Sequence, residues 1–367
     1  MHEIVGATPV AGWVFVMPRV LAITLVLLCA YLAAAILGVV FQASHGYTRF
    51  ELGHYLLWLV LPGTFEALLL AILAVFIQTV VHHKFLGWAV MLLYIVANIA
   101  LGSAGFEHNL YNYAGTPNVM LSDMNGVGRF WIARAWFHAY WLAFGLILLV
   151  ISHGLWRRGT ETRWAARTKQ LKHHLTGPAG WVLALGIAAW IGLGSYNFYN
   201  TNILNRYLTQ PDRDRTQAEY EKAVLAYEKV PQPRIVDVQL DVELFPQEVR
   251  AKARGKYMLE NRTSAPISNV HVRWDPVSLR MDELTVEKGH IVKEYKQYNY
   301  RIYQLAQPLQ PGERMHVTFQ TTLQERGFPN AQPLTKIVEN GTFLNNYDVT
   351  PWIGIDRSIA LTDRAKR

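Results

Sequence analysis

Three polar side chains fall inside otherwise apolar stretches, and they are the first candidates for chemistry. Glu66 lies near the middle of one stretch, while Arg134 and His138 lie four residues apart in another, and so on one face of a helix. Such groups are costly inside a membrane unless they are paired or hydrated. We favour an ion pair between Glu66 and Arg134 that fixes helix packing; the alternative is a substrate or proton pathway. Pro62-Gly63, one turn before Glu66, predicts a kink there.

The sequence contains none of the common catalytic or cofactor motifs. The stretch nearest to H-E-x-x-H is His-Ile-Val-Lys-Glu from His290, and C-x-x-C, Walker and G-x-S-x-G motifs are absent. His271, His290 and His316 belong to separate segments, so neither the number nor the spacing of ligands supports a metal site. We therefore expect no catalytic residue, no metal and no cofactor in this chain.

Composition divides the chain into an apolar half and a charged half. Of 35 Lys and Arg and 27 Asp and Glu residues, 11 and 6 fall in residues 1–197, and 24 and 21 fall in the remainder. The net charge of +8 is not arranged as a basic stripe interleaved with aromatic residues, so we expect no nucleic-acid partner. The single cysteine, Cys29, excludes an intramolecular disulfide and is expected to be a buried packing residue.

Five stretches are apolar enough to cross a bilayer, which takes about 20 residues because every backbone N–H and C=O must be satisfied within the segment. The lipid bilayer is therefore the first expected partner. We predict an all-α membrane bundle over residues 1–199. The predicted spans are Val20–Phe41, Tyr55–Val80, Phe85–Leu101, Trp131–Ile151 and Trp181–Tyr199.

The distribution of basic residues predicts the orientation of these spans. The connection 153–176 carries six Lys and Arg against one acid, Glu161, and short basic loops stay on the cytoplasmic side. Counting all connections gives eight basic residues inside and two outside, which places the N-terminus inside and the region after Tyr199 outside. A solvated segment facing lipid headgroups suffices to explain the basic connection, and a specific binding partner is the alternative. The basic residues are Arg157, Arg158, Arg163, Arg167, Lys169 and Lys172.

The connection 102–130 is too long and too aromatic to be a plain loop. Tyr111, Tyr113, Met120 and Met124 argue against disorder. We expect this connection to pack on the outer face of the bundle as short re-entrant helices.

The second half predicts a linker followed by an all-β domain. Residues 200–230 are polar and include a short amphipathic helix over 216–229. Residues 231–367 show strict alternation of apolar and polar residues between Pro, Gly and Asn turns, which predicts an antiparallel sandwich or saddle-shaped sheet. The sequons at Asn261 and Asn340 would matter only in a secretory eukaryotic setting. The alternating segments are 236–244, 249–259, 270–274, 298–305 and 315–323.

Several short runs give the chain a family resemblance. PQPRIVDVQLDVELF from Pro231, GKYMLENRTSAPISNVHV from Gly255, QPLQPGERMHVTF from Gln307, GFPN from Gly327 and ENGTFLNN from Glu339 resemble the N-terminal β domain of aminopeptidase N-type zinc metallopeptidases. The combination is similar to the version fused behind an ABC-transporter permease in large bacterial membrane proteins. SDMNG from Ser122 and the five spans resemble the second membrane half of that permease.

The resemblance implies a multi-pass protein of the bacterial inner (plasma) membrane, with its β domain periplasmic or extracellular. It implies a permease component served by a separate ATP-binding subunit on the cytoplasmic side. The family's H-E-x-x-H zinc helix and G-x-M-E-N loop lie downstream of the matched part, so no catalytic residue is carried over and zinc belongs only to that downstream domain. We expect a fragment, or a naturally short relative, of a permease–peptidase fusion. Two alternatives stay open: the front of a membrane-anchored zinc aminopeptidase, and a membrane-anchored binding module without transport.

Overall fold

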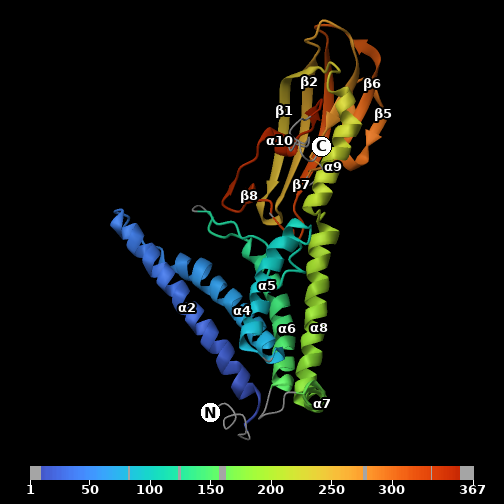
Figure 1. Ribbon diagram of the computed structural model, residues 1–367. Helices are drawn as coiled ribbons and strands as arrows, with labels where there is room; N and C mark the ends of the chain where they lie inside the picture. Colours follow the sequence, from blue (N-terminus) through green and yellow to red (C-terminus); the bar gives the residue numbers. More distant parts are fainter. Residues whose placement is uncertain are drawn as a thin grey trace. The chain divides into compact units, whose positions relative to one another are not determined.

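The computed structural model describes residues 10–81, 83–122, 125–156, 163–275, 279–331 and 333–355. The chain forms two compact units (Figure 1). The helical unit comprises Met1–Val119 and Arg129–Tyr199, and the β unit comprises Met120–Gly128 and Asn200–Arg367.

The helical unit contains five helices long and apolar enough to span a membrane, as the sequence predicts. The first begins earlier than expected, at Trp13, and contains Pro18, whose missing N–H leaves out one intrahelical hydrogen bond. Cys29 on this helix was expected to be buried and is exposed. The helices of this unit are α2 (Trp13–Ser44), α3 (Leu52–His54), the π-helical η1 (Tyr55–Val60), α4 (Leu61–Val80), α5 (Lys84–Ser103), α6 (Trp131–Leu155), α7 (Trp164–Leu175) and α8 (Pro178–Phe198).

The long helices pack in the order α2, α4, α6, α8, with α5 against α4 and α7 against α6 and α8 (Figure 1). A π-helical segment, η1, stands directly before Pro62, the residue that cannot donate an intrahelical hydrogen bond. Gly63 permits the close approach of α2 to α4, because a Cβ there would lie 2.6 Å from the ring of Tyr31. The absence of a side chain at Gly63 thus shapes the α2–α4 contact.

The β unit begins with helical segments that pack onto the sheets. Thr209 caps α9 (Gln210–Val224) by accepting a hydrogen bond from the Asp212 amide at 3.2 Å. Tyr220 and Val224 are buried against Tyr298, Tyr300 and Ile302. The segment that the sequence suggested as a linker therefore carries part of a core. The π-helical η2 (Tyr199–Leu204) precedes α9, and the 3₁₀ segment η3 (Leu225–Tyr227) follows it.

Two four-stranded antiparallel sheets form the rest of this unit, so the predicted antiparallel β domain is confirmed. One has the order β1-β2-β7-β4 and the other β10-β3-β6-β5. A two-stranded hairpin, β8-β9, and the short α10 (Asn346–Val349) complete the unit. The strands are β1 (Arg234–Phe245), β2 (Arg250–Glu260), β3 (Ile267–Arg273), β4 (Leu279–Val286), β5 (Gly289–Tyr295), β6 (Tyr300–Leu309), β7 (Arg314–Gln324), β8 (Ile337–Val338), β9 (Gly341–Thr342) and β10 (Trp352–Ile353).

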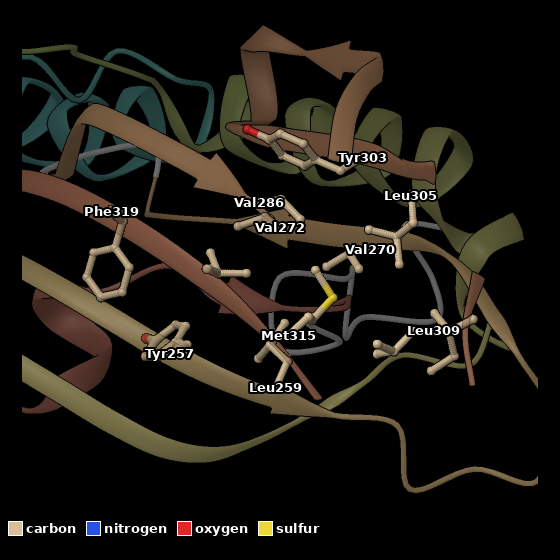
Figure 2. Close-up of a cluster of buried hydrophobic side chains, with 12 residues drawn as sticks. Tyr257, Leu259, Val270, Val272, Val286, Tyr303, Leu305, Leu309, Met315 and Phe319 are labelled. Carbon is tan, nitrogen blue, oxygen red and sulfur yellow. The ribbon is translucent and has the colours of Figure 1, made fainter. Parts of the chain in front are cut away.

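The inner faces of the two sheets share one apolar core (Figure 2). Leu259 and Val317 from the first sheet meet Val270 and Val272 from the second, and all four are fully buried. Alternation along each strand supplies these side chains, since every second residue faces the opposing sheet.

Edge strand β1 departs from the predicted burial. Its alternating apolar residues were expected on a half-buried face, yet Val238, Val242 and Leu244 are 41%, 37% and 45% exposed. Leu240 alone of this face packs against the two core clusters of the sandwich. The strand is hydrogen-bonded only to β2, because it lies at the edge of the sheet. Alternation of apolar and polar residues therefore predicts the strand correctly but does not predict how much of its apolar face is buried.

Strands β4 and β5 were not predicted, because a bulge breaks the alternation in each. The register shifts between Met281 and Glu283 in β4 and between Ile291 and Lys293 in β5. A bulge adds one residue to one strand and moves the following side chains to the other face. A search for strict period-two patterns therefore misses both.

Candidate functional site

Glu66 and His138 meet inside the helical unit. Glu66 lies on α4 and His138 on α6, and the Glu66 Oε1 is 3.9 Å from the His138 Nε2. The ring of Phe65 packs against the imidazole, with centroids 4.5 Å apart. The Glu66 side chain is 41% exposed and that of His138 only 13%, so the acid is the open side of the pair. This separation is longer than a hydrogen bond, and the His138 Nε2 is buried without a hydrogen-bond partner among the described residues.

The favoured ion pair between Glu66 and Arg134 is not formed. Among the described residues no ion pair joins them, and the Arg134 Nε is buried without a hydrogen-bond partner. The reason is the axial offset of the two helices, which brings His138, one turn farther along α6, to the level of Glu66. Arg134 is thus left as a half-buried cation beside an apolar bundle.

The part of the connection 102–130 that belongs to the helical unit, residues 104–119, packs into the bundle. The Tyr113 hydroxyl donates to the carbonyl of Leu69 at 2.8 Å, one turn along α4 from Glu66. The Trp141 indole donates to the Gly115 carbonyl at 3.0 Å. Packing against the bundle was predicted, but the expected re-entrant helices are not found: the described part of this connection consists of turns and extended backbone.

His108 is a buried residue of the same connection that the sequence did not single out. It is 2% exposed, and its Nδ1 accepts a hydrogen bond from the Leu110 amide at 3.1 Å. Burial lowers the pKa of His108 to about 4, so the imidazole is neutral at physiological pH. In the sequence, only the aromatic residues near His108 indicated that this loop buries side chains.

Arg167, from the basic connection, has a structural role that the sequence did not indicate. It lies on α7, is 3% exposed, and donates from its Nε to the carbonyl of Leu155 at 3.0 Å. A second guanidinium nitrogen donates to the Thr79 carbonyl. These carbonyls belong to the last turns of α6 and α4, whose carbonyls lack intrahelical partners. The solvated state expected for this connection is therefore wrong for Arg167; Arg157, Arg158 and Glu161 lie outside the described residues.

The histidines of the β unit do not form a metal site. His271 is 2% exposed and shares a 2.6 Å hydrogen bond between its Nδ1 and the Tyr300 hydroxyl, while His290 and His316 lie on other strands. Burial lowers the pKa of His271 to about 4. Within the described part of the chain, no three His, Cys, Asp or Glu side chains gather as a metal centre would require.

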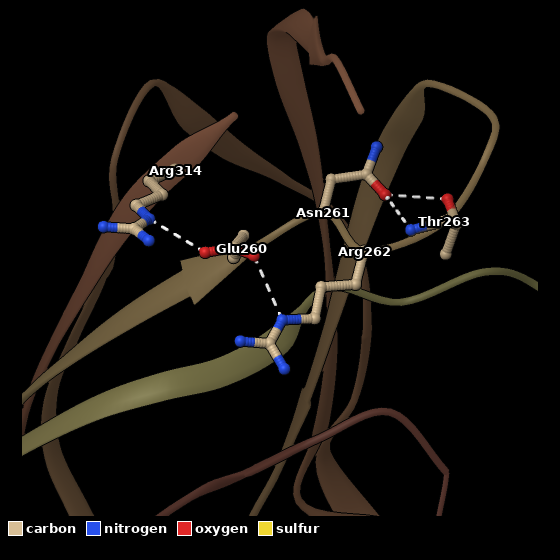
Figure 3. Close-up of polar contacts among 5 residues, drawn as sticks. All are labelled: Glu260, Asn261, Arg262, Thr263 and Arg314. Atoms are coloured by element: carbon tan, nitrogen blue, oxygen red, sulfur yellow. Dashed lines mark hydrogen bonds and ion pairs between the residues drawn. The ribbon is translucent and has the colours of Figure 1, made fainter. Parts of the chain in front are cut away.

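The sequon at Asn261 is used to hold a turn (Figure 3). Asn261 is fully buried, donates to the carbonyls of Ala265 and Leu309, and accepts from the backbone and hydroxyl of Thr263 at 2.9 and 2.7 Å. Next to it, Arg262 and Arg314 lower the pKa of the Glu260 carboxyl. The Asn-x-Thr spacing here serves local folding.

A shallow depression of about 520 Å³ lies on the polar face of the first sheet. Acidic and basic side chains alternate across it, and the Gln320 amide donates to Glu283 at 2.9 Å. Mixed charge with internal pairing is typical of a solvated sheet face. Its polar lining residues are Gln239, Asp241, Arg254, Lys256, Glu283, Thr318 and Gln320.

The Glu66–His138 pair with Arg134 is therefore the candidate site of the molecule. A scan of protein-family models and a search of curated proteins found no match to this chain.

Proposed function

We propose that this chain is the membrane component of an ABC-type transporter in a bacterial inner membrane, with an exterior β domain. The observation that carries the proposal is the Glu66–His138 contact inside an apolar helical unit. Ionisable groups at such positions are retained where they face a polar pathway. The short runs that resemble a permease–peptidase fusion supply the transporter class.

Glu66, His138 and Arg134 line the proposed pathway. A purely structural ion pair would have its guanidinium and carboxylate in contact, yet Arg134 makes no such contact among the described residues. The half-buried Arg134 guanidinium and the partly exposed Glu66 carboxylate are therefore better placed to contact a passing solute or proton than two groups that neutralise each other. The N-terminus and α7 would face the cytoplasm, where a separate ATP-binding subunit would bind.

The test is purification of the protein from its native membranes with its partners attached. We expect an ATP-binding subunit to co-purify and to hydrolyse ATP. In the same complex Arg134→Gln is expected to abolish transport while leaving assembly intact, and Arg49→Gln, in the connection 45–51, is the matched control. Purification without any ATPase would refute the transporter proposal.

A second candidate function rests on the β unit, whose sequence runs resemble the aminopeptidase N-terminal domain. In that case the chain is the front part of a membrane-anchored zinc aminopeptidase, and the sandwich supports a catalytic domain that follows it. The native protein would then bind zinc stoichiometrically and hydrolyse an aminoacyl anilide. Zinc and peptidase activity without a co-purifying ATPase would favour this candidate, and the absence of all three would favour a binding module.

A further inference from the structure

Helix α7 presents one face to its own helical unit and leaves another uncovered. Arg167 is buried, and through its bonds to Leu155 and Thr79 it fixes the rotation of the helix. The opposite face is exposed and carries residues at helical spacing from Trp164 onward. These are Trp164, Ala165, Thr168, Lys169, Lys172 and His173.

The exposed face of α7 is basic and without acidic partners. No Asp or Glu occurs in the helix, and among the described residues no carboxylate pairs with the ammonium groups of Lys169 or Lys172. Trp164, at the edge of this face, is 46% exposed, and the Arg167 guanidinium lies 4.8 Å from the centre of its ring. Unpaired lysines next to a half-exposed tryptophan are the composition of surfaces that lie at lipid headgroups.

The position of α7 in the helical unit matches this composition. Arg167 ties it to the last residue of α6, and only Thr176 and Gly177 separate it from the first residue of α8. Both of those helices are candidate membrane spans. If they cross the bilayer, as the proposed function requires, α7 lies at the level of the headgroups.

We infer that the exposed face of α7 binds the headgroups of anionic phospholipids, with Lys169 and Lys172 as the principal contacts and Trp164 at the acyl boundary. This inference rests on the membrane location in the proposed function and adds a ligand to it. Attraction to an anionic surface grows with each lysine near it and weakens with salt. Arg167 takes no part in the binding; it holds the face outward.

The test uses the full chain in a neutral detergent, with dioctanoyl phosphatidylglycerol and dioctanoyl phosphatidylcholine as probes and native mass spectrometry as the readout. We expect preferential binding of phosphatidylglycerol, and a loss of roughly tenfold or more in affinity in the Lys169→Gln/Lys172→Gln variant. The matched control, Lys252→Gln/Lys256→Gln, removes the same charge from exposed positions of β2 and should bind like the wild type.

Three outcomes would overturn the inference. Equal binding of the two lipids would show that the protein has no preference for the anionic headgroup. Equal losses of affinity in both double variants would show that binding depends only on the net charge of the protein. Binding of free glycerol phosphate with the affinity of the lipid would identify a soluble phosphate site instead. Lipid binding through these lysines in a protein that never associates with an ATPase would leave the inference standing and refute the transporter proposal alone.

Discussion

At the scale of single residues, the chemistry of the helical unit depends on which side chain of α6 reaches Glu66. The carboxylate meets an imidazole, which can be neutral or charged, and leaves a permanent cation one turn away. The side chain of α6 that lies beside Glu66 therefore decides whether the acid faces an imidazole or a guanidinium.

A double-mutant cycle measures this contact. Glu66→Gln and His138→Gln are expected to be coupled by about 1 kcal/mol or more in the free energy of unfolding, because each change removes the same interaction. Glu66→Gln and Arg134→Gln should be additive within about 0.5 kcal/mol. Thermal or denaturant unfolding of the full chain in detergent gives both values. Stronger coupling to Arg134 than to His138 would show that the acid pairs with the guanidinium.

His271 predicts a pH dependence of the β unit. Its pKa is about 4 in the folded protein, against an unfolded value of about 6.5. Between these values the unfolded chain binds a proton that the native protein does not, so the free energy of unfolding falls as the pH is lowered from about 6.5 to about 4. The loss reaches up to about 3 kcal/mol at the lower end.

Replacing His271 by Gln should flatten this part of the pH profile, whatever it does to stability at neutral pH. Denaturant unfolding of the full chain at several pH values, followed by a probe in the β unit, measures the slope. His290→Gln is the control, since that residue is exposed on β5. An unchanged slope in the His271 variant would mean that another group titrates.

At the scale of elements, buried connections between helix ends and close approaches between strands hold the parts together. Arg167, on α7, connects this helix to α6 and α4 by donating hydrogen bonds to carbonyl groups at the ends of those two helices. In the sandwich, the ring of Phe319 on β7 lies against the backbone of Gly255 on β2, its register partner. Neither contact involves the candidate site, so each can be tested separately from function.

Arg167→Gln is expected to destabilise the helical unit by roughly 2–4 kcal/mol, because it leaves buried helix-end carbonyls without a charged donor. Lys169→Gln, two residues away on the exposed face, should stay within about 0.5 kcal/mol of the wild type. Thermal unfolding in detergent compares the two variants. Equal stabilities would show that Arg167 does not hold the helix ends.

Gly255→Ala tests the close approach in the sandwich. A Cβ at this position would lie 2.1 Å from the Phe319 ring, which is itself buried, so the core must shift at a cost of roughly 1–3 kcal/mol. Gly341→Ala, where the new Cβ meets nothing within 4 Å, is the control. Adding Phe319→Leu to Gly255→Ala should recover part of the loss; no recovery would place the strain elsewhere.

At the scale of the whole molecule, a helical unit with five candidate spans is joined to a β unit with its own core. The helical unit covers its long helices poorly: within the span segments of α2, α5 and α8, 11% or fewer of the residues are buried. Lipid acyl chains would cover these apolar surfaces in a membrane. The sandwich needs no such cover, because its apolar residues lie mostly between its sheets.

Labelling of single cysteines tests the proposed orientation. In a Cys29→Ala background, a cysteine at Lys169 should be protected from an impermeant reagent in intact cells, and a cysteine at Lys256 should react. Both positions are exposed in the structure, whereas Asn261 is buried and unsuited to labelling. Reaction of both cysteines from outside would mean that the number of crossings between them is even.

The sequence by itself determined the two halves of the molecule and most of their long elements. Five stretches of about 20 mostly apolar residues predicted five long helices, because such stretches satisfy their backbone groups internally as helices, and the structure has five helices long and apolar enough to span a membrane. Strict alternation likewise located β1, β2, β3, β6 and β7, because side chains of a strand point to opposite faces in turn. Bulges hid β4 and β5 from the same argument.

Only the tertiary structure decided which residues meet. The partner of Glu66 depends on the axial offset between α4 and α6, and helical periodicity fixes the face of a residue without fixing its height against a neighbouring helix. The burial of Arg167 and His271 likewise depends on partners distant in sequence. Arg167 bonds to the Thr79 carbonyl, and His271 shares a hydrogen bond with the Tyr300 hydroxyl. Local patterns report what a segment can form, and contacts between segments arise only when the whole chain packs.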